Sequence, residues 1–353
     1  MSRTLISLVI FALAVVMALV ISCAPEPAPT AAPLPTVPPT LAPTTIPLVK
    51  ITSAWSMTNA DPAPLWIAQD IGFFKQNGLE VQVIYLDGGT KHAQALISKD
   101  VAIGVTSAAP VVSADAGGAD LRLVAGLVNV LNYDFIVRPS IKSGADLKGK
   151  KVAVSGASGS SATAMRLALR TSFNLDPDKD VATVSIGNEA ERETALLSGQ
   201  IDATVVNPDT SIKAKKDGLV VLESLWGKPI PYAHTGIGTT QSFAKTNPQV
   251  VTAFLKSIIQ ATGYIRDPAN KSTTIKTIAK YLKLDDQELL EQAYARMSQT
   301  ILACAPYVPM DGMKTVIGET KTAVDAGLTA DQVADNSFVK SLDDSGFVKA
   351  NCH

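Results

Sequence analysis

The sequence contains few of the residues on which catalytic and metal sites depend. Its 353 residues include three histidines and three cysteines. His92, His234 and His353 show no paired metal-binding spacing, and no G-x-S-x-G nucleophile motif occurs. Lysine and arginine total 31 against 32 for aspartate and glutamate, so the basic excess typical of nucleic-acid-binding proteins is missing. We therefore expect no catalytic residue, no metal, no cofactor and no nucleic-acid partner.

The first 22 residues are predicted to form a signal peptide. Arg3 precedes the almost wholly apolar stretch Leu5–Ile21, a composition typical of a secretory signal or a short membrane anchor. The stretch ends at Leu19-Val20-Ile21-Ser22-Cys23, which resembles the bacterial lipobox, where the signal is cleaved and the cysteine is lipidated. We expect an extracytoplasmic lipoprotein anchored to the cell membrane at Cys23. An uncleaved transmembrane helix is the alternative, because the run approaches the roughly 20 residues that span a bilayer.

Residues 23–48 are predicted to form a stalk. The segment consists mainly of proline, alanine and threonine, and Glu26 is its one acidic residue. Such a composition cannot bury enough apolar surface to offset chain entropy, and its prolines favour an extended chain. The stalk would hold a globular body away from the membrane.

The remaining two cysteines form a candidate disulfide. If Cys23 is lipidated, Cys304 and Cys352 are an even pair in an oxidising compartment. We predict a bond that ties the C-terminal tail to the body; two unpaired thiols are the alternative.

The body after the stalk has the size and the pattern of a two-domain α/β protein. Short β-rich runs alternate with helical stretches, which is typical of mostly parallel sheets covered by helices. Asp61-Pro62 is a predicted helix start, with the acid as N-cap. Residues 95–103 (ALISKDVAI) and 195–203 (ALLSGQIDA) resemble one another. Both are predicted to end a helix and enter a buried strand, which suits two similar lobes.

Three predicted strand-to-helix junctions are rich in glycine, serine and threonine. They lie at residues 87–92, 106–110 and 155–161. Such junctions expose unpaired backbone N–H groups at the positive end of a helix dipole, and in an open parallel sheet they lie where ligands bind. We expect a polar or anionic ligand to contact Gly89, Thr90, Thr106, Ser107, Ser158, Ser160 and Ser161. Simple N-capping is the alternative for each junction.

Two aromatic candidates stay open at this point. Trp55, at the end of the first predicted strand, could stack on a planar ligand or fill the core. His92, in the first turn of a predicted helix, could contact ligand or have a capping role.

The order of several motifs resembles a known family, the substrate-binding proteins of ABC transporters in the nitrate/sulfonate/taurine group, which includes binders of thiamine-pyrimidine precursors. The matching segments are residues 63–74 (APLWIAQDIGFF) with 78–81, 116–121 (AGGADL), 146–154 (DLKGKKVAV), 197–203 (LSGQIDA) and 247–248.

The resemblance implies a type II periplasmic-binding-protein fold with two lobes and two interdomain crossings. Lobe I would comprise residues 49–136 and 236–353, and lobe II residues 137–235. The crossings would lie near residues 135–139 and 234–239. Family ligand contacts imply Trp55, Thr58 and Asn59 after the first strand, and Asn207 and Asp209 after a later one.

The implied function is capture of a small polar or anionic organic solute, such as a sulfonate, nitrate or a pyrimidine-like molecule, in the cleft between the lobes. The protein would act as a monomer and deliver the solute to the permease and ATPase subunits of an ABC importer. Many relatives have an acid where this chain has Asn207, which weakens the case for a cationic amine. An enzyme on the same fold, such as a pyrimidine-precursor synthase or a desulfinase relative, and a ligand-sensing ectodomain are the alternatives.

Overall fold

The computed structural model describes residues 47–352. The predicted signal peptide, the lipidation site at Cys23 and all but the last two residues of the stalk lie outside the described residues. Within the described range, no helix combines the length and the apolar character needed to cross a membrane.

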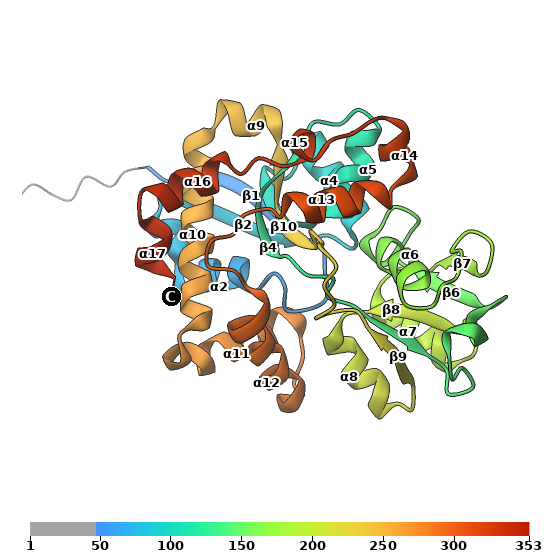
Figure 1. The fold of residues 1–353 in the computed structure, drawn as a ribbon. Helices are drawn as coiled ribbons and strands as arrows, with labels where there is room; N and C mark the ends of the chain where they lie inside the picture. The colour runs from blue at the N-terminus through green and yellow to red at the C-terminus, as the bar shows by residue number, and fades with distance from the viewer. Residues whose placement is uncertain (1–46, 353) are drawn as a thin grey trace, which may run out of the picture. The chain divides into compact units, whose positions relative to one another are not determined.

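The described residues form two five-stranded sheets (Figure 1). The first has the order β2-β1-β3-β10-β4, with β1 Val49–Trp55, β2 Leu79–Tyr85, β3 Ile103–Ser107, β4 Leu121–Val128 and β10 Thr235–Thr240. The second has the order β7-β6-β8-β5-β9, with β5 Asp134–Val137, β6 Lys151–Val154, β7 Ala182–Ser185, β8 Ala203–Val206 and β9 Val220–Ser224.

The two sheets are built in the same way. In each, the strand next to one edge, β1 or β6, pairs in parallel with both of its neighbours. The strand that follows a crossing runs antiparallel to its neighbours: β10 against β3 and β4, β5 against β8 and β9. Four of the five strands in each sheet therefore run in the same direction, so the sheets are mostly parallel, as expected. Each crossing of the chain adds the one strand that runs the other way. The sequence echo at 95–103 and 195–203 leads into β3 and β8, which occupy equivalent positions.

The strand that follows the first crossing corrects the predicted lobe boundary. We expected residues up to 136 in lobe I, but β5 pairs with β8 and β9 of the second sheet. The crossings are therefore residues 129–133 and 225–234. The first lies before the expected range of 135–139, and the second ends where the expected range of 234–239 begins. All four residues of β5 are buried, so an apolar run here fits either sheet, and only pairing decides between them.

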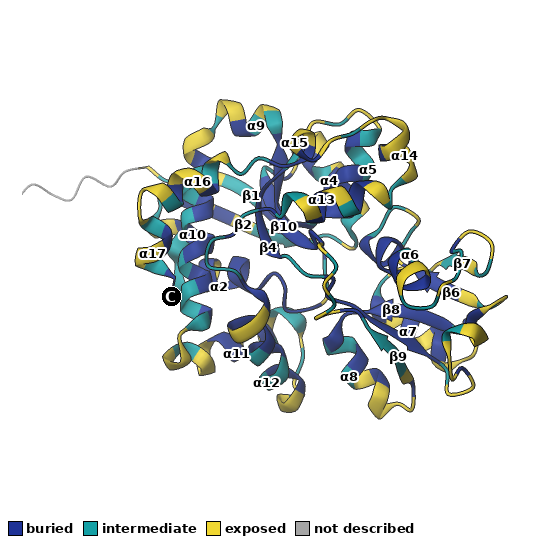
Figure 2. Cartoon of the chain, in the orientation of Figure 1, coloured by how far each residue is buried: buried dark blue, intermediate teal, exposed yellow. Residues whose placement is uncertain are grey.

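Helices cover both sheets, with exposed residues gathered on their outer faces (Figure 2). The first half of the chain contributes α2 Ala63–Ile71, α3 Phe73–Gln76, α4 Gly89–Ser98 and α5 Ala108–Ala116, and the second sheet has η1 Gly144–Leu147, α6 Ser160–Thr171, α7 Glu189–Leu197 and α8 Pro208–Lys216. The C-terminal part adds α9 Gln241–Thr246, α10 Pro248–Arg266, η2 Pro268–Asn270, α11 Lys271–Leu282, α12 Gln287–Arg296, the π-helical turn η3 Met297–Ile301, α13 Met310–Gly318, α14 Lys321–Asp325, α15 Ala330–Val333, α16 Ser337–Asp344 and α17 Phe347–Asn351.

The first sheet with its helices and the second sheet with its helices form the two halves of the body. The apolar core continues from one half to the other. One cluster of buried side chains packs α10 on α2, with Phe254 and Trp66 among its members. A second cluster contains Leu123 of β4 together with Val152 of β6 and Met165 of α6, and α5 contacts α6. Because burial of apolar surface is the main stabilising term in folding, this second cluster stabilises contact between the halves.

The C-terminal tail is joined to the body by a disulfide between Cys304 and Cys352, whose Cα atoms lie 5.3 Å apart. The tail also packs tightly on α10 at Gly263. A Cβ atom at this glycine would lie 1.9 Å from the backbone oxygen of Asn351. The sequence of α10 thus contains a glycine where the returning chain leaves no room for a side chain.

Candidate functional site

A cavity of about 420 Å³ lies at the strand-to-helix junctions of both sheets. The β1–α2, β2–α4 and β3–α5 junctions line one side, and the β6–α6, β7–α7 and β8–α8 junctions line the other. The lining residues are Ser56, Met57, Thr58, Tyr85, Asp87, Gly88, Gly89, Thr90, Lys91, Ser107, Pro110, Tyr133, Ser155, Gly156, Gly159, Ser160, Ser161, Gly187, Asn188, Glu189, Arg192 and Asn207.

The wall from the first sheet combines helix N-termini with an aromatic side chain. Gly88 has a φ of 87°, a left-handed conformation that favours glycine, and α4 begins directly after it. Tyr85 is partly exposed, and its hydroxyl donates to Asp87 Oδ1 at 3.3 Å. Burial, and then the neighbouring Asp87, raise the pKa of Tyr85 to about 12. The phenol is therefore neutral near pH 7 and presents an apolar ring to the cavity.

The wall from the second sheet contains the N-terminus of α6. Ser161 Oγ accepts the backbone N–H of Ser155 at 2.8 Å and also bonds with the Ser155 hydroxyl. The Ser161 hydroxyl thus stabilises the loop through these two hydrogen bonds. Ser160 differs, because its Oγ is buried and has no hydrogen-bond partner among the described residues. A helix N-terminus with a free hydroxyl is suited to an electronegative group.

A buried charged pair, which we did not predict, forms part of this wall. Glu189 accepts the backbone N–H of Asn207 at 3.1 Å, its side-chain amide at 2.5 Å and the hydroxyl of Thr210 at 2.5 Å. Arg192 Nη2 lies 3.9 Å from Glu189 Oε1. Burial raises the pKa of Glu189, and Arg192, Thr210 and Asn207 oppose that shift.

Arg192 is itself held by the protein. Its guanidinium donates to Thr204 Oγ1 at 3.1 Å, to the Gly187 carbonyl at 2.7 Å and to the Val205 carbonyl at 3.2 Å. Burial lowers the pKa of Arg192, and Glu189 opposes that shift. The sequence signal for this pair was the junction at 185–192, where Asn188 and Glu191 form a capping box at the start of α7.

The residues at the crossings are held by a buried carboxylate. Asp61 accepts from Thr235 Oγ1 at 3.1 Å and Asn132 Nδ2 at 3.4 Å, and His234 Nε2 lies 3.3 Å from Asp61 Oδ2. Burial opposes ionisation of Asp61, but His234, then Arg296 and Thr235, hold the pKa of its carboxyl below the ordinary value. Asp61 therefore does not cap α2 as expected, since both crossings bring hydrogen-bond donors to it.

Seven of the twelve predicted ligand-binding residues line the cavity, namely Thr58, Gly89, Thr90, Ser107, Ser160, Ser161 and Asn207. Their contact with ligand stays a prediction. Trp55, Asn59, Thr106, Ser158 and Asp209 are not among the lining residues.

For four of the predicted residues that do not line the cavity, the structure shows where the side chain lies instead. Trp55 packs against the rings of Trp66, Tyr85 and Tyr281, and of these Tyr85 lines the cavity. Thr106 is fully buried within β3, and Asn59 Oδ1 accepts the backbone N–H of Asp61. Asp209 forms an ion pair with Arg296. His92 is also fully buried and outside the lining.

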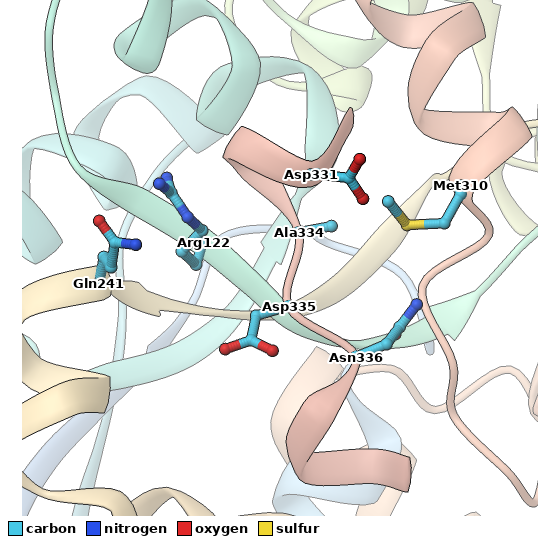
Figure 3. Close-up of a pocket in the computed structure, with 7 residues that line it drawn as sticks. All are labelled: Arg122, Gln241, Met310, Asp331, Ala334, Asp335 and Asn336. Carbon is cyan, nitrogen blue, oxygen red and sulfur yellow. The ribbon is translucent and has the colours of Figure 1, made fainter. Parts of the chain in front are cut away.

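A second hollow, of about 330 Å³, lies on the first half of the body (Figure 3). Arg122, Asp331 and Asp335 supply its charged groups. Arg122 Nη1 lies 3.2 Å from Asp115 Oδ2, and Asn336 both donates to and accepts from the backbone of Val308. Arg122 and Asn336 are thus engaged by the protein, and no residue of the second sheet or its helices lines this hollow. We do not assign a ligand to this hollow.

Comparison with known proteins agrees with this geometry. The model of the family described as NMT1/THI5 like matches residues 59–271, which include both sheets except the first strand. The chain belongs to the NMT1/THI5-like family. The matched range contains every junction that lines the cavity, apart from residues 56–58.

Two curated relatives extend the comparison. The taurine-binding periplasmic protein of Escherichia coli (strain K12) is 30% identical over 226 residues, which cover 62% of this chain and 68% of the relative. A protein of Brachyspira hyodysenteriae (strain ATCC 49526 / WA1), which carries the provisional name of an ABC transporter periplasmic binding protein, is 26% identical over 286 residues, covering 74% and 76% of the two chains.

The fold is shared with solved structures. The alkanesulfonate-binding protein SsuA from Xanthomonas axonopodis pv. citri, bound to MOPS, superposes with a TM-score of 0.63 at 19% identity. The match covers 84% of this chain and 98% of that one. The expected type II periplasmic-binding-protein fold is thereby confirmed.

Proposed function

We propose that this NMT1/THI5-like protein is the solute-binding component of an ABC importer, and that it binds a small polar or anionic organic solute in the cavity between the two sheets. The observation that carries the proposal is the composition of the cavity wall. Junctions from both sheets meet there, so one small molecule can contact both halves of the body at once.

The chemistry of the wall supports a polar ligand. Its charged side chains form two pairs of opposite charge. Lys91 Nζ lies 4.0 Å from Asp87 Oδ2, and Arg192 lies beside Glu189. Helix N-termini and hydroxyl groups then remain to bind an electronegative group. Taurine and the alkanesulfonates, named for the relative and the solved structure described above, have such groups. Nitrate and a pyrimidine-like solute remain within the proposal.

The proposed mechanism is capture by closure. A solute that contacts both halves stabilises the closed arrangement in proportion to its greater affinity for that arrangement. The closed body would then dock on the permease, and the ATPase subunits would drive uptake. We propose that the protein works as a monomer outside the cytoplasm, anchored through a lipid on Cys23.

The proposal is tested by a thermal-unfolding screen against sulfonates, nitrate, bicarbonate, aromatic acids, pyrimidines and flavins. A solute present at 100 times its dissociation constant should add about 2.7 kcal/mol to the free energy of unfolding. Each solute that binds is then recovered after overnight incubation and compared with the starting material. Recovery of unchanged solute supports capture, whereas a product would favour an enzyme on this fold.

A further inference from the structure

The side-chain amide of Asn207 is buried and lines the cavity. Its Nδ2 lies 2.5 Å from Glu189 Oε1, and the Asn207 backbone N–H donates to the same oxygen at 3.1 Å. A backbone N–H can only donate, so Oε1 accepts it, and the Arg192 guanidinium 3.9 Å from Oε1 favours the ionised carboxylate, which has no proton to donate to the amide. The amide must therefore turn Nδ2 toward Glu189 and its carbonyl oxygen, Oδ1, away from it.

Oδ1 is left without a hydrogen-bond partner among the described residues. A buried carbonyl oxygen is costly to leave unpaired. Ser160 Oγ is also buried without a partner on the same cavity. The second-sheet wall thus presents two unmet requirements: Oδ1 needs a donor, and the N-terminus of α6 favours an electronegative group.

We propose that the solute carries an N–H or O–H group that donates to Asn207 Oδ1, together with an electronegative group that binds at Ser160. This inference rests on the proposed function and narrows its solute class. Small anions without a donor are disfavoured, because they would bring negative charge against a carbonyl oxygen. The requirement is for a hydrogen and not for positive charge, since Asn207 is neutral.

Glu189 is the positioning residue for this preference. It fixes the Asn207 amide in one orientation, and the Thr210 hydroxyl at Oε2 and Arg192 near Oε1 hold the carboxyl in place. Glutamine at position 189 would keep an acceptor for both bonds, whereas methionine, of similar length, has only a weak one. In Glu189→Met the Asn207 amide is therefore free to turn, and Nδ2 can face the cavity.

The test uses matched probes that differ in one donor. Ethanesulfonate has no donor, isethionate adds an O–H, taurine adds an ammonium N–H, and N,N,N-trimethyltaurine keeps the charge without the N–H. 2-Methylpyrimidine against 4-amino-2-methylpyrimidine, and propionate against lactate, repeat the comparison on other frames. Isothermal titration measures each affinity.

On any frame that binds, we expect the donor-bearing member to bind about 10- to 100-fold more tightly. Trimethyltaurine should bind like ethanesulfonate. Equal affinities within the pairs would overturn the inference while leaving the proposed function intact. Failure of every probe on every frame would reject the proposed function for these solute classes, and the inference with it.

Two variants test the residues. Asn207→Leu should abolish the preference between pair members, and Glu189→Met should reduce it to less than about threefold. Glu193→Met is the matched control, because Glu193 is a buried glutamate on the same helix, pairs with Lys213 at 2.8 Å and does not line the cavity. It should keep the full preference. Thermal unfolding checks that each variant is folded, and an unchanged preference in either Asn207→Leu or Glu189→Met contradicts the proposal.

Discussion

The carboxylate of Asp209, at the start of α8, forms an ion pair with the guanidinium of Arg296, at the end of α12. Both side chains are largely buried, with 16% and 9% of their surfaces exposed. Helix α8 packs on β5 and β9 of the second sheet, whereas α12 packs on α11, which contacts α2 on the first half. The pair therefore links the two halves of the body beside the cavity.

Removing one partner of this pair should be destabilising mainly because the other partner is left buried and unpaired. Arg296→Met should lower the free energy of unfolding by about 3 kcal/mol, because Asp209 would remain buried without its partner. The double variant Asp209→Leu/Arg296→Met should lose less than the single one. Urea denaturation measures both.

The control for this prediction is an exposed pair between the same helices. Lys216 Nζ lies 3.3 Å from Asp286 Oδ2 and 2.8 Å from Glu288 Oε2, and Lys216 is 46% exposed. Lys216→Met should cost less than about 1 kcal/mol. An equal effect of Arg296→Met and Lys216→Met would show that burial of the Asp209–Arg296 pair is unimportant.

Ser160→Asp should prevent binding of an anionic solute and leave the fold intact. The new carboxylate would stand at the N-terminus of α6, where its repulsion of an anion would be worth several kcal/mol. Titration with the best solute of the screen measures the effect. Ser158→Asp is the comparison, because Ser158 lies in the same loop but does not line the cavity. Unaltered affinity in Ser160→Asp would remove this helix start from the site.

The disulfide between Cys304 and Cys352 should stabilise the folded chain. It closes a segment with a sequence separation of 48, and a loop of that length corresponds to about 4 kcal/mol in the chain-entropy model. Replacement of both cysteines by serine should lower the free energy of unfolding by a similar amount. Dithiothreitol should destabilise the parent protein and leave the double variant unchanged. Two alkylatable thiols in the unreduced parent would contradict the bond.

Gly263→Ala should destabilise the protein by about 2 kcal/mol or more, because the added methyl group would meet the backbone of Asn351. Gly318→Ala is the matched control. Gly318 lies in α13, and a Cβ atom there would meet nothing within 4 Å. That change should be neutral or stabilise by up to about 1 kcal/mol, since alanine favours helix. Thermal or urea unfolding of the two variants gives the comparison, and similar losses would refute tight packing at Gly263.

His92 should make stability depend on pH in the acid range. Burial lowers its pKa from 6.5 to about 4. Below pH 6.5 the unfolded chain therefore takes up a proton that the folded chain does not. Because of His92, the free energy of unfolding should fall by about 3 kcal/mol between pH 6.5 and pH 4. Above pH 6.5, His92 should have no effect on it.

The measurement is the difference between the parent and His92→Gln in urea unfolding at pH 7, 5.5 and 4.5. The pKa values of some other groups are shifted upward. Burial raises the pKa of Asp115 to about 7, for example, which stabilises the folded chain as the pH falls. Such effects are common to both proteins and cancel in the difference. Parallel pH profiles would show that His92 is not the group responsible.

Local sequence was sufficient for the elements and for much of the cavity wall. Glycine and hydroxyl residues after predicted strands placed Gly89, Thr90, Ser107 and Ser160 at helix starts, because capping chemistry acts over a few residues. The expectation that Asp209 contacts the solute came instead from the family resemblance, and the structure pairs its carboxylate with Arg296. An acid in the first turn of a helix looks the same whether it faces a ligand or a distant arginine.

The tertiary structure decided how those local pieces meet. Asp61 became a buried acceptor at the crossings because Asn132 and Thr235, far away in the sequence, supply donors. The assignment of β5 to the second sheet rests on its pairing partners. The hydrogen bonds between Glu189 and Asn207 form only because the β7–α7 and β8–α8 junctions of the second sheet lie together in the folded chain.

By itself, the order of residues determined a two-part α/β body with polar helix starts, since helix and strand signals depend on near neighbours. Which polar atoms are satisfied by the protein, and which remain for a solute, was decided by packing between remote segments. That difference arises because the partner of a buried hydrogen-bonding group is set by distance in space and not by separation along the chain.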